Sequence, residues 1–363
     1  MAHDWASKFG GAEKVTRSIV ETFPDSKLCT LWRDPDSELG SADTLQIFRP
    51  PKVLKKQRSF LVPFFLIAWR RFRVPSDVRI VIASSHLFAH AIKPKTKNGR
   101  KIKKFTYCHT PARYIWVPEL DRRGNNILAK AVSKILRPID KFYARESDLA
   151  CNSEFVQQRI KDCWGLDSRV IYPPVDVDLF RSYATLSESQ LTHITGIQPG
   201  FVLAASRFVK YKNLDIVIRA AAESGDRLVV AGQGSDETRL RKVAAECGGD
   251  VTFVISPSNQ ELGALFSSAK VYVFPAIEDF GIMVVEAMAS GTPVIVNDQG
   301  GARESLIAGK TGTTFQNGNI QSLVQCLKSA EVYSPKDCIG RAQYFSKTRF
   351  SNEIIEWLGP AIC

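Results

Sequence analysis

The sequence predicts an α/β protein built from two doubly wound, parallel-sheet domains. Three observations lead to this expectation. The chain has 363 residues, of which 44% are hydrophobic; short apolar runs alternate with helical patterns; and a proline-containing stretch divides the chain near its middle. Because a single hydrophobic core stops growing near ~250–300 residues, a chain of this length fits two domains better than one.

The strand–helix alternation is clearest in the C-terminal half of the chain. Apolar runs typical of buried strands are each followed by a helical pattern. The expected strands are residues 201–206, 226–232, 251–255, 270–276 and 293–298. Strands separated by helices in this way pair in parallel, so this half is expected to form a doubly wound sheet.

The N-terminal half repeats the alternation less clearly. Its expected strands are residues 27–32, 77–85, 103–110 and 148–153. The stretch IYPPVDVDLF (171–180) contains two prolines and is typical of a connector between domains. Residues 340–358 have the pattern of a helix that carries aromatic side chains.

Basic residues are concentrated in the N-terminal half. Residues 1–180 hold 32 Lys/Arg and 19 Asp/Glu, whereas residues 181–363 hold 17 and 18. Between residues 44 and 118 there are 17 basic residues and one acid, Asp77. This asymmetry predicts that the N-terminal half faces a polyanion, which could be a membrane, a nucleic acid or an anionic acceptor.

The cysteine and hydropathy patterns exclude several classes of protein. The eight cysteines are scattered without a CxxC pair, so neither a disulfide framework nor a zinc site is expected. No apolar run reaches the ~18 residues of a membrane-spanning helix, and the start MAHDWASKFGG lacks a secretory signal. These features indicate a protein of the reducing cytosol.

An acidic residue in the apolar segment EDFGIMVVEAMASGTPVIV (278–296) is the first functional clue. Glu286 lies about one turn into a helix expected to begin near Gly281, and a carboxylate there needs hydrogen-bond donors. The first N–H groups of that helix, at Ile282 and Met283, form an anion site suited to phosphate. A ribose diol would satisfy Glu286, and sugar hydroxyls would suit Glu278; a surface salt bridge is the alternative for Glu286.

Two further motifs are weak alone. In SRFVKYKN (206–213), Arg207 and Lys212 follow an apolar strand and could reach a phosphate, although loop cations are commonly just solvated. In FGGAEKV (9–15), Gly10 and Gly11 open a helix and allow close approach of a phosphate or sugar, although a simple turn is as good an interpretation.

Together these motifs resemble the retaining, nucleotide-sugar-dependent glycosyltransferases of family 4. The E-x7-E element matches at Glu278 and Glu286, and the R-x4-K element at Arg207 and Lys212. The GGAE loop matches at residues 10–13, and the likeness covers nearly the whole chain. Within the family, HDW…GGAEKV and FTYCHTPARYIW are similar to bacterial enzymes that often transfer mannose from GDP-mannose in O-antigen or exopolysaccharide synthesis.

The resemblance implies a GT-B fold, in which two facing Rossmann-like domains enclose a deep interdomain cleft. The N-terminal, acceptor-binding domain would comprise residues 1–178 plus 341–363, including a crossover helix, and the C-terminal domain, residues 179–340, would bind the donor. The residues implied as catalytic are Glu278, His109, Arg207 and Lys212. Those implied as donor-binding are Gly10, Gly11, Arg207, Lys212, Gly281, Ile282, Met283 and Glu286.

Some of these implications have alternatives. His109 would lie near the donor sugar, although it could also be a hydrogen-bonded histidine at a strand end. Family members begin with an apolar strand of about six residues before HDW, and here only Met1 and Ala2 precede it, so the first strand is expected to be clipped. This leaves the placement of Gly10 and Gly11 open.

The resemblance also implies that no metal or other cofactor takes part. Arg207, Lys212 and the helix after Gly281 would stabilise the departing nucleoside diphosphate instead of a divalent cation. Asp176-Val177-Asp178 imitates the DxD metal motif of another glycosyltransferase fold, but it lies in the proline-containing connector. We therefore interpret it as linker sequence.

A membrane surface is the favoured polyanion. The segment KVLKKQRSFLVPFFLIAWRRFRV (52–74) has an apolar centre of eleven residues, 59–69, which is too short to span a bilayer. Cations flank this centre, and residues 93–104 add seven more Lys and Arg residues. We expect peripheral attachment to the inner face of the cytoplasmic membrane, near a lipid-linked or polysaccharide acceptor. The alternative is a helix packed on the core with solvated flanks.

Other functions stay open at this point. The donor could be a UDP-sugar rather than GDP-mannose, and the chain could be a non-catalytic relative, although all the expected donor-site residues are present. A basic nucleic-acid-binding protein is a different class, but no RNA-binding signature is found and the E-x7-E helix would then have no role. We therefore expect a nucleotide-sugar donor, a glycan acceptor and no nucleic acid as partners.

Overall fold

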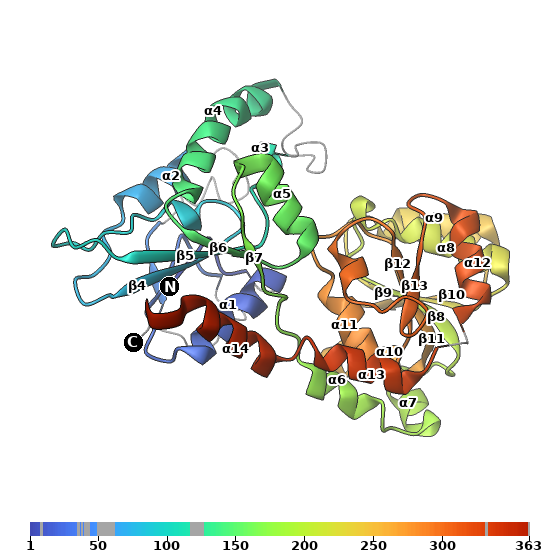
Figure 1. The fold of residues 1–363 in the computed structure, drawn as a ribbon. Helices are drawn as coiled ribbons and strands as arrows, with labels where there is room; N and C mark the ends of the chain where they lie inside the picture. Colours follow the sequence, from blue (N-terminus) through green and yellow to red (C-terminus); the bar gives the residue numbers. More distant parts are fainter. Residues whose placement is uncertain are drawn as a thin grey trace. The chain divides into compact units, whose positions relative to one another are not determined.

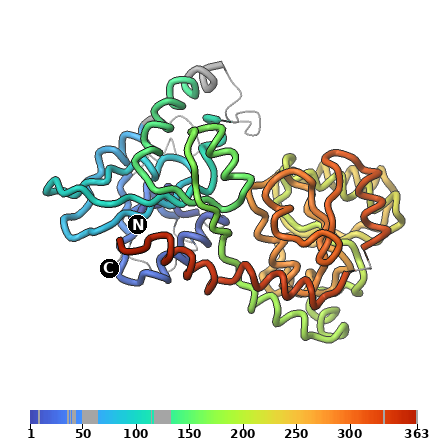
Figure 2. The backbone as a smooth tube through the Cα atoms, viewed as in Figure 1, coloured from blue at the N-terminus to red at the C-terminus, as the bar shows by residue number. Residues whose placement is uncertain are grey.

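The computed structural model describes residues 1–7, 10–34, 37, 39, 44–48, 62–116, 127–330 and 333–361. The chain divides into unit 1, Met1–Pro174 with Thr348–Cys363, and unit 2, Val175–Lys347. It leaves unit 1 after Pro174, inside the proline-containing connector and before the expected boundary at 178, and it returns after Lys347 rather than after 340 (Figure 2). Each unit is an α/β body, while the facing arrangement and the cleft stay predictions.

Unit 1 contains a parallel sheet in the order β3-β2-β1-β4-β5-β6-β7. The strands are β1 Ala2–His3, β2 Leu28–Thr30, β3 Thr44–Gln46, β4 Ile80–Ser85, β5 Lys103–Cys108, β6 Asp148–Cys151 and β7 Arg169–Val170. The helices are α1 Gly11–Thr22, α2 Val62–Arg71, η3 Ala89–Ala91, α3 Arg113–Trp116, α4 Ile127–Ala144, α5 Glu154–Trp164, α14 Lys347–Leu358 and η9 Gly359–Ala361.

Helices cover both faces of this sheet because both of its faces are apolar. On one face Val15 and Ile19 of α1 pack with Phe350 and Ile354 of α14. Figure 1 shows α14, in red, beside α1, in blue, although the two are far apart in sequence. On the other face α2 and α4 pack over η3 in a second apolar cluster.

Unit 2 contains a parallel sheet in the order β10-β9-β8-β11-β12-β13. The strands are β8 Phe201–Ala205, β9 Leu228–Gly232, β10 Val251–Ile255, β11 Ala269–Phe274, β12 Val294–Asn297 and β13 Gly312–Phe315. The helices are α6 Val177–Tyr183, α7 Glu188–Thr195, η6 Lys210–Lys212, α8 Leu214–Ser224, α9 Glu237–Cys247, α10 Asn259–Ser268, α11 Ile282–Ala289, η7 Gly301–Glu304, α12 Ile320–Lys328 and α13 Pro335–Gln343.

All the expected strands are present, and their bounds differ by a few residues. Four strands, β1, β3, β7 and β13, were not expected as such. The short β1 nevertheless lies at the centre of its sheet, where Ala2 pairs with Cys29 on one side and Ala83 on the other. The placement of Gly10 and Gly11 is also defined, because α1 begins at Gly11 with Gly10 as its N-cap.

The single helix expected over residues 340–358 is wrong. The chain forms two helices, α13 and α14, separated at Tyr344–Ser346. The break follows from pairing across the unit: Val175 donates its N–H to the carbonyl of Phe345, and Val175 and Ser346 form an isolated bridge. Phe345 is fully buried there, and the chain is not helical at this residue, so that its side chain packs in the interior.

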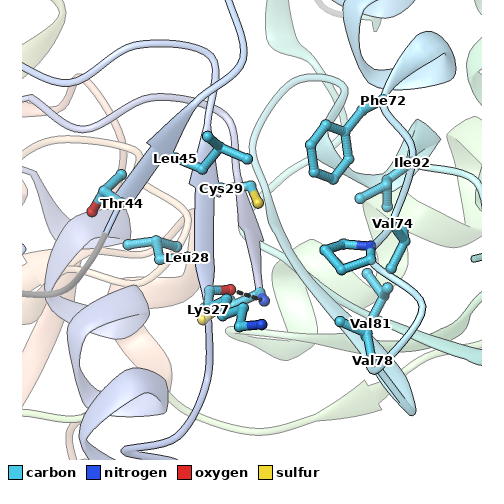
Figure 3. Close-up of a pocket in the computed structure, with 12 residues that line it drawn as sticks. Lys27, Leu28, Cys29, Thr44, Leu45, Phe72, Val74, Val78, Val81 and Ile92 are labelled. Atoms are coloured by element: carbon cyan, nitrogen blue, oxygen red, sulfur yellow. Dashed lines mark hydrogen bonds between the residues drawn. The ribbon is translucent and has the colours of Figure 1, made fainter. Parts of the chain in front are cut away.

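A cavity of about 290 Å³ opens at the amino ends of the unit 1 strands (Figure 3). Leu28 and Thr44 begin β2 and β3, and their side of the cavity faces the side chains of Phe72, Val74 and Ile92. In parallel sheets, ligands bind beyond the carboxyl ends of the strands. This cavity therefore lies at the edge of the unit 1 sheet opposite to the edge where His109 follows β5.

The expected membrane segment is partly corrected. Residues 52–61 lie outside the described residues, and α2 covers Val62–Arg71. Phe65 and Trp69 are buried in the core of unit 1, so they are not free to contact a bilayer, whereas Phe64 remains 55% exposed. The alternative of a helix packed on the core is therefore correct for one face of α2.

One of the seven cations at 93–104 is also buried. The ammonium of Lys104 donates to the carbonyls of His90, Ile92 and Tyr143 and lies 3.3 Å from the Glu146 carboxylate. Burial lowers the pKa of Lys104 to about 8, despite the opposing charge of Glu146. Lys104 therefore ties together α4 and η3 and does not contribute to a basic surface.

Candidate active site

The candidate donor site of unit 2 lies where strands β8, β11 and β12 end. Arg207 and Lys212 follow β8, the loop with Glu278 follows β11, and Gly300 follows β12. The Glu278 loop is held by the next one, because the N–H of Gly301 donates to the carbonyl of Glu278 over 2.8 Å. The sequence motifs that resemble the family therefore meet at the carboxyl edge of one sheet, which is where parallel sheets bind ligands.

An ion pair joins two of these motifs. The Lys212 ammonium lies 2.5 Å from the Glu278 carboxylate, with side chains 7% and 22% exposed. The rings of Tyr211 and Phe274 also lie 5.4 and 5.3 Å from the ammonium. A cation so enclosed is positioned before any ligand arrives, which is the arrangement that stabilises developing negative charge.

The other motif residue, Arg207, is placed differently. Its side chain is exposed and donates to the Tyr211 hydroxyl over 2.8 Å. Arg207 thus lies on the same turn as Lys212, but it can change its conformation at low cost. Its planar donor group suits phosphate oxygens.

Glu286 is 4% exposed, in the middle of α11. Its charge and that of Glu278 both act on Tyr272 of β11, whose pKa is raised well above its usual value by burial first and then by these two charges. The Tyr272 hydroxyl donates to the carbonyl of Ala205, the last residue of β8. The structure therefore brings both carboxylates of the E-x7-E element close to the same buried tyrosine.

Helix α11 begins at Ile282, directly after Gly281. Gly281 has φ +90°, and a Cβ there would come within 3.0 Å of Ala302. A side chain at this position is therefore both strained and crowded. Ile282 and Met283 are half-buried, and their N–H groups belong to the first turn, where helix donors have no intrahelical acceptor.

In unit 1, His109 lies directly after β5 and is 7% exposed. Its Nε2 is 2.7 Å from the Ser84 hydroxyl, and this hydroxyl is 2.8 Å from that of Thr16. Burial, and then the neighbouring His86 and His3, lower the pKa of His109 well below its usual value. The imidazole is therefore neutral at neutral pH. The structure thus shows the alternative interpretation of His109, a histidine hydrogen-bonded at a strand end. This hydrogen bond does not exclude a role of His109 near the donor sugar.

The sequence motifs did not reveal the support of this histidine. His3 lies beside His109, and burial lowers the pKa of His3 to about 4, with His86 acting in the same direction. Asp4 is fully buried and accepts the backbone N–H groups of residues 86–89. His3 and Asp4 are part of the HDW motif, but the backbone groups that Asp4 binds are more than 80 residues away in sequence.

Gly10 is followed by a second buried carboxylate. Glu13 is 3% exposed and accepts hydrogen bonds from the N–H and the hydroxyl of Ser7. Burial alone would raise the pKa of Glu13, but His3 and the Ser7 donors outweigh it and lower the pKa. A Cβ at Gly10 would overlap the Glu13 carboxylate, so the glycine keeps this arrangement intact.

The remaining acidic motif does not join the site. Asp176 lies 2.5 Å from the ammonium of Lys347, and Asp178 is in the first turn of α6. Within the described ranges, no three His, Cys, Asp or Glu side chains lie close enough together to hold a metal ion.

A model of "Glycosyltransferase Family 4" matches residues 9–179, and a model of "Glycosyl transferases group 1" matches residues 195–337. The chain belongs to the family 4 glycosyltransferases. The two models cover both units, which agrees with the resemblance of the motifs.

A GDP-mannose-dependent alpha-(1-6)-phosphatidylinositol monomannoside mannosyltransferase of Mycobacterium tuberculosis is 30% identical over 51% of this chain and 52% of its own length. The chain thus spans about half the length of the curated relatives it matches. Two solved structures cover 98% of both chains. They are the lipopolysaccharide outer core galactosyltransferase WaaB (TM-score 0.69, 20% identity) and Anabaena HepE with UDP-glucose (0.72, 19%). At this identity they show the GT-B fold of this glycosyltransferase, with its Rossmann-like units.

Proposed function

We propose that this glycosyltransferase moves a hexose from a nucleotide-sugar donor to a glycan acceptor, with retention of anomeric configuration. The observation that carries the proposal is the enclosed Lys212–Glu278 pair at the carboxyl edge of the unit 2 sheet, with buried Glu286 on the helix that follows Glu278. Unit 2 takes the donor in this proposal, and unit 1 takes the acceptor.

Each donor-site residue has a part in the proposed reaction. The leaving diphosphate gains negative charge, which Lys212, Arg207 and the first N–H groups of α11 stabilise where it develops. Glu278 holds hydroxyls of the transferred sugar, and Glu286 accepts hydrogen bonds from the ribose. With these cationic and dipolar groups in place, no metal ion or other cofactor is required.

His109 and the α1 start would complete the donor site from unit 1. A neutral imidazole can donate or accept one hydrogen bond to a sugar hydroxyl without placing a cation beside an oxocarbenium-like transition state. The low pKa of His109 favours this use over general-acid chemistry. Gly10 and Gly11 would let a phosphate or sugar approach the backbone.

GDP-mannose is the proposed donor and mannose the transferred sugar, because the mycobacterial relative is named as GDP-mannose-dependent. A UDP-sugar is the second candidate, favoured by the structural similarity to HepE, which was solved with UDP-glucose. The proposed acceptor is a lipid-linked sugar or a growing polysaccharide in cell-surface glycan synthesis. Attachment would then be peripheral, on the inner face of the cytoplasmic membrane; none of the helices in the described residues is long and apolar enough to cross a bilayer.

A donor screen tests the proposal. Thermal shift and donor hydrolysis would be measured with GDP-mannose, UDP-glucose and UDP-GlcNAc for the wild type, for Glu286→Gln and for Glu246→Gln, an exposed control in unit 2. One donor should stabilise the wild type and the control but bind the Glu286 variant at least tenfold more weakly. If no nucleotide sugar binds the wild type, or if both variants bind alike, the assignment of this site is wrong.

A further inference from the structure

Two helices of unit 1 expose large apolar side chains that the fold does not use. On α2, Phe64 and Ile67 are 55% and 45% exposed; on α4, Ile135 and Phe142 are 66% and 59% exposed. Residues three or seven positions apart lie on one side of a helix, so each pair forms a stripe. The opposite side of each helix is buried in the core, where it holds α2 and α4 to the sheet. We call these four residues the α2–α4 face.

The two stripes belong to the same side of unit 1. The Arg70 guanidinium of α2 lies 4.0 Å from the centre of the Tyr143 ring of α4 and 3.0 Å from the Glu146 carboxylate. Arg70 also donates to the carbonyl of Ala91 in η3, on which both helices pack. Figure 1 shows α2 and α4 on one face of the unit 1 sheet.

Cations surround this face, and its acids are neutralised. Arg71, Lys134 and Arg145 are exposed on the two helices or directly after α4. Of the acids on the described side chains of α2 and α4 and directly after them, Asp140 is buried and Glu146 is paired with Arg70 and Lys104. The local field is therefore strongly positive.

A basic hairpin extends the positive surface beyond the end of α2. It is attached there by the N–H of Lys97, which donates to the carbonyl of Val74 over 2.8 Å, and by a bridge between Val74 and Thr96. Its exposed cations are Lys93, Lys95, Lys97, Arg100, Lys101 and Lys103. The hairpin thus adds six exposed cations beside the C-terminal end of α2.

We propose that the α2–α4 face docks on an anionic lipid surface. Separate apolar side chains among cations are the composition of interfacial helices, whose apolar groups enter the headgroup region while the cations meet lipid phosphates. Each basic residue near an anionic leaflet adds to the attraction, so the surface acts as a whole. This deepens the proposed peripheral attachment and rests on it. Phe65, Trp69 and Lys104 are buried and cannot contact lipid, so the proposal assigns that contact to the exposed side chains of the α2–α4 face instead.

Vesicle co-sedimentation tests this with two variants of the face. Ile135→Ser/Phe142→Ser removes apolar contact, and Lys134→Glu/Arg145→Glu reverses charge. The matched controls lie in unit 2. Ile255→Ser/Ile307→Ser removes two apolar side chains that are each 42% exposed, and Lys242→Glu/Lys310→Glu makes the same change of charge.

The wild type should bind phosphatidylglycerol vesicles, bind neutral phosphatidylcholine vesicles at least tenfold more weakly, and dissociate as salt is raised. Both face variants should bind anionic vesicles at least tenfold more weakly, while both controls should bind as the wild type does. Donor-induced thermal shift should be equal in all five proteins, which separates a failure of docking from a failure of the proposed donor site and shows that the variants fold.

Three results would overturn the proposal. The wild type could ignore anionic vesicles at low salt. The face variants could bind them as tightly as the controls do. A homopolymeric RNA could displace the wild type from vesicles and bind the face variants at least tenfold more weakly, which would assign the face to nucleic acid instead of lipid.

Discussion

Replacing Lys212 by methionine separates its electrostatic role from its packing. Methionine matches the length of the aliphatic part of lysine, so it can still fill the space beside Tyr211 and Phe274, whose rings lie 5.4 and 5.3 Å from the ammonium. What is lost is the charge that lies 2.5 Å from Glu278. The variant therefore removes one positioned cation with little change in shape.

The size of the effect follows from the position of this charge. Removing one positioned group that stabilises a developing anion lowers kcat by roughly 10²–10³, or about 3–4 kcal/mol. Because the charge on the leaving phosphate grows in the transition state, kcat should fall more than the donor KM rises. The cost in stability should be smaller, about 1–3 kcal/mol, because Glu278 keeps a 22% exposed side chain that water can reach.

Steady-state transfer, with donor concentration varied, measures this prediction, and thermal unfolding checks the fold. Lys210→Met is the matched control, because Lys210 lies in the same short η6 turn and is exposed. The control should retain wild-type kcat and KM. A Lys212 variant that raises the donor KM at unchanged kcat would mean that the ammonium binds ground state and transition state equally, which would refute the assigned role.

Three further outcomes are expected. Glu286→Gln should lower kcat/KM by about 1.5–3 kcal/mol, the value of a charge-assisted hydrogen bond, while the melting temperature stays within a few degrees of wild type. Transfer should persist in EDTA; complete loss that Mn²⁺ restores would instead give Asp176 and Asp178 a metal-binding role. In denaturant unfolding, the free energy of unfolding of the wild type should rise by up to about 3 kcal/mol relative to that of Lys104→Met as pH increases from about 8 to 10.5. The reason is that the unfolded chain binds the Lys104 proton more tightly than the folded chain does. An equal pH dependence of the two proteins would show that Lys104 is not desolvated.

Much of unit 2 could be predicted from the sequence because local patterns decide it. Strands β8 to β12 are mostly apolar runs, and their parallel pairing follows from their alternation with helices, whereas the order β10-β9-β8-β11-β12 in the sheet was not predicted. The short β13 was missed because GTTF contains one large apolar residue, Phe315, and its place in the sheet is set by pairing with β12. The donor motifs were found because each follows a strand that the sequence had already defined.

The supports of His109 could not be predicted in the same way. The Ser84 hydroxyl bonds to His109, and Thr16 and His3 in turn bond to Ser84. These residues come from three separate segments of unit 1, and only folding brings their hydroxyl and imidazole groups together. The orientation of α2 was ambiguous for a related reason. Its apolar residues occur on more than one side of the helix, and the sequence alone did not indicate that Phe65 would be buried and Phe64 exposed.

Helix α14 has a consequence for how the chain is made. It supplies Phe350 and Ile354 to a core whose buried residues outside this helix come from segments before Pro174, between Val15 and Ile171. The N-terminal part of unit 1 leaves the ribosome long before this helix does. The apolar side chains of Val15 and Ile19 therefore lack their α14 partners while all of unit 2 is synthesised. Unit 2 is continuous in sequence and can close first. A helix that is synthesised after all of unit 2 thus completes the core of unit 1, and a chain without this helix would expose the interior of unit 1 to chaperones and proteases.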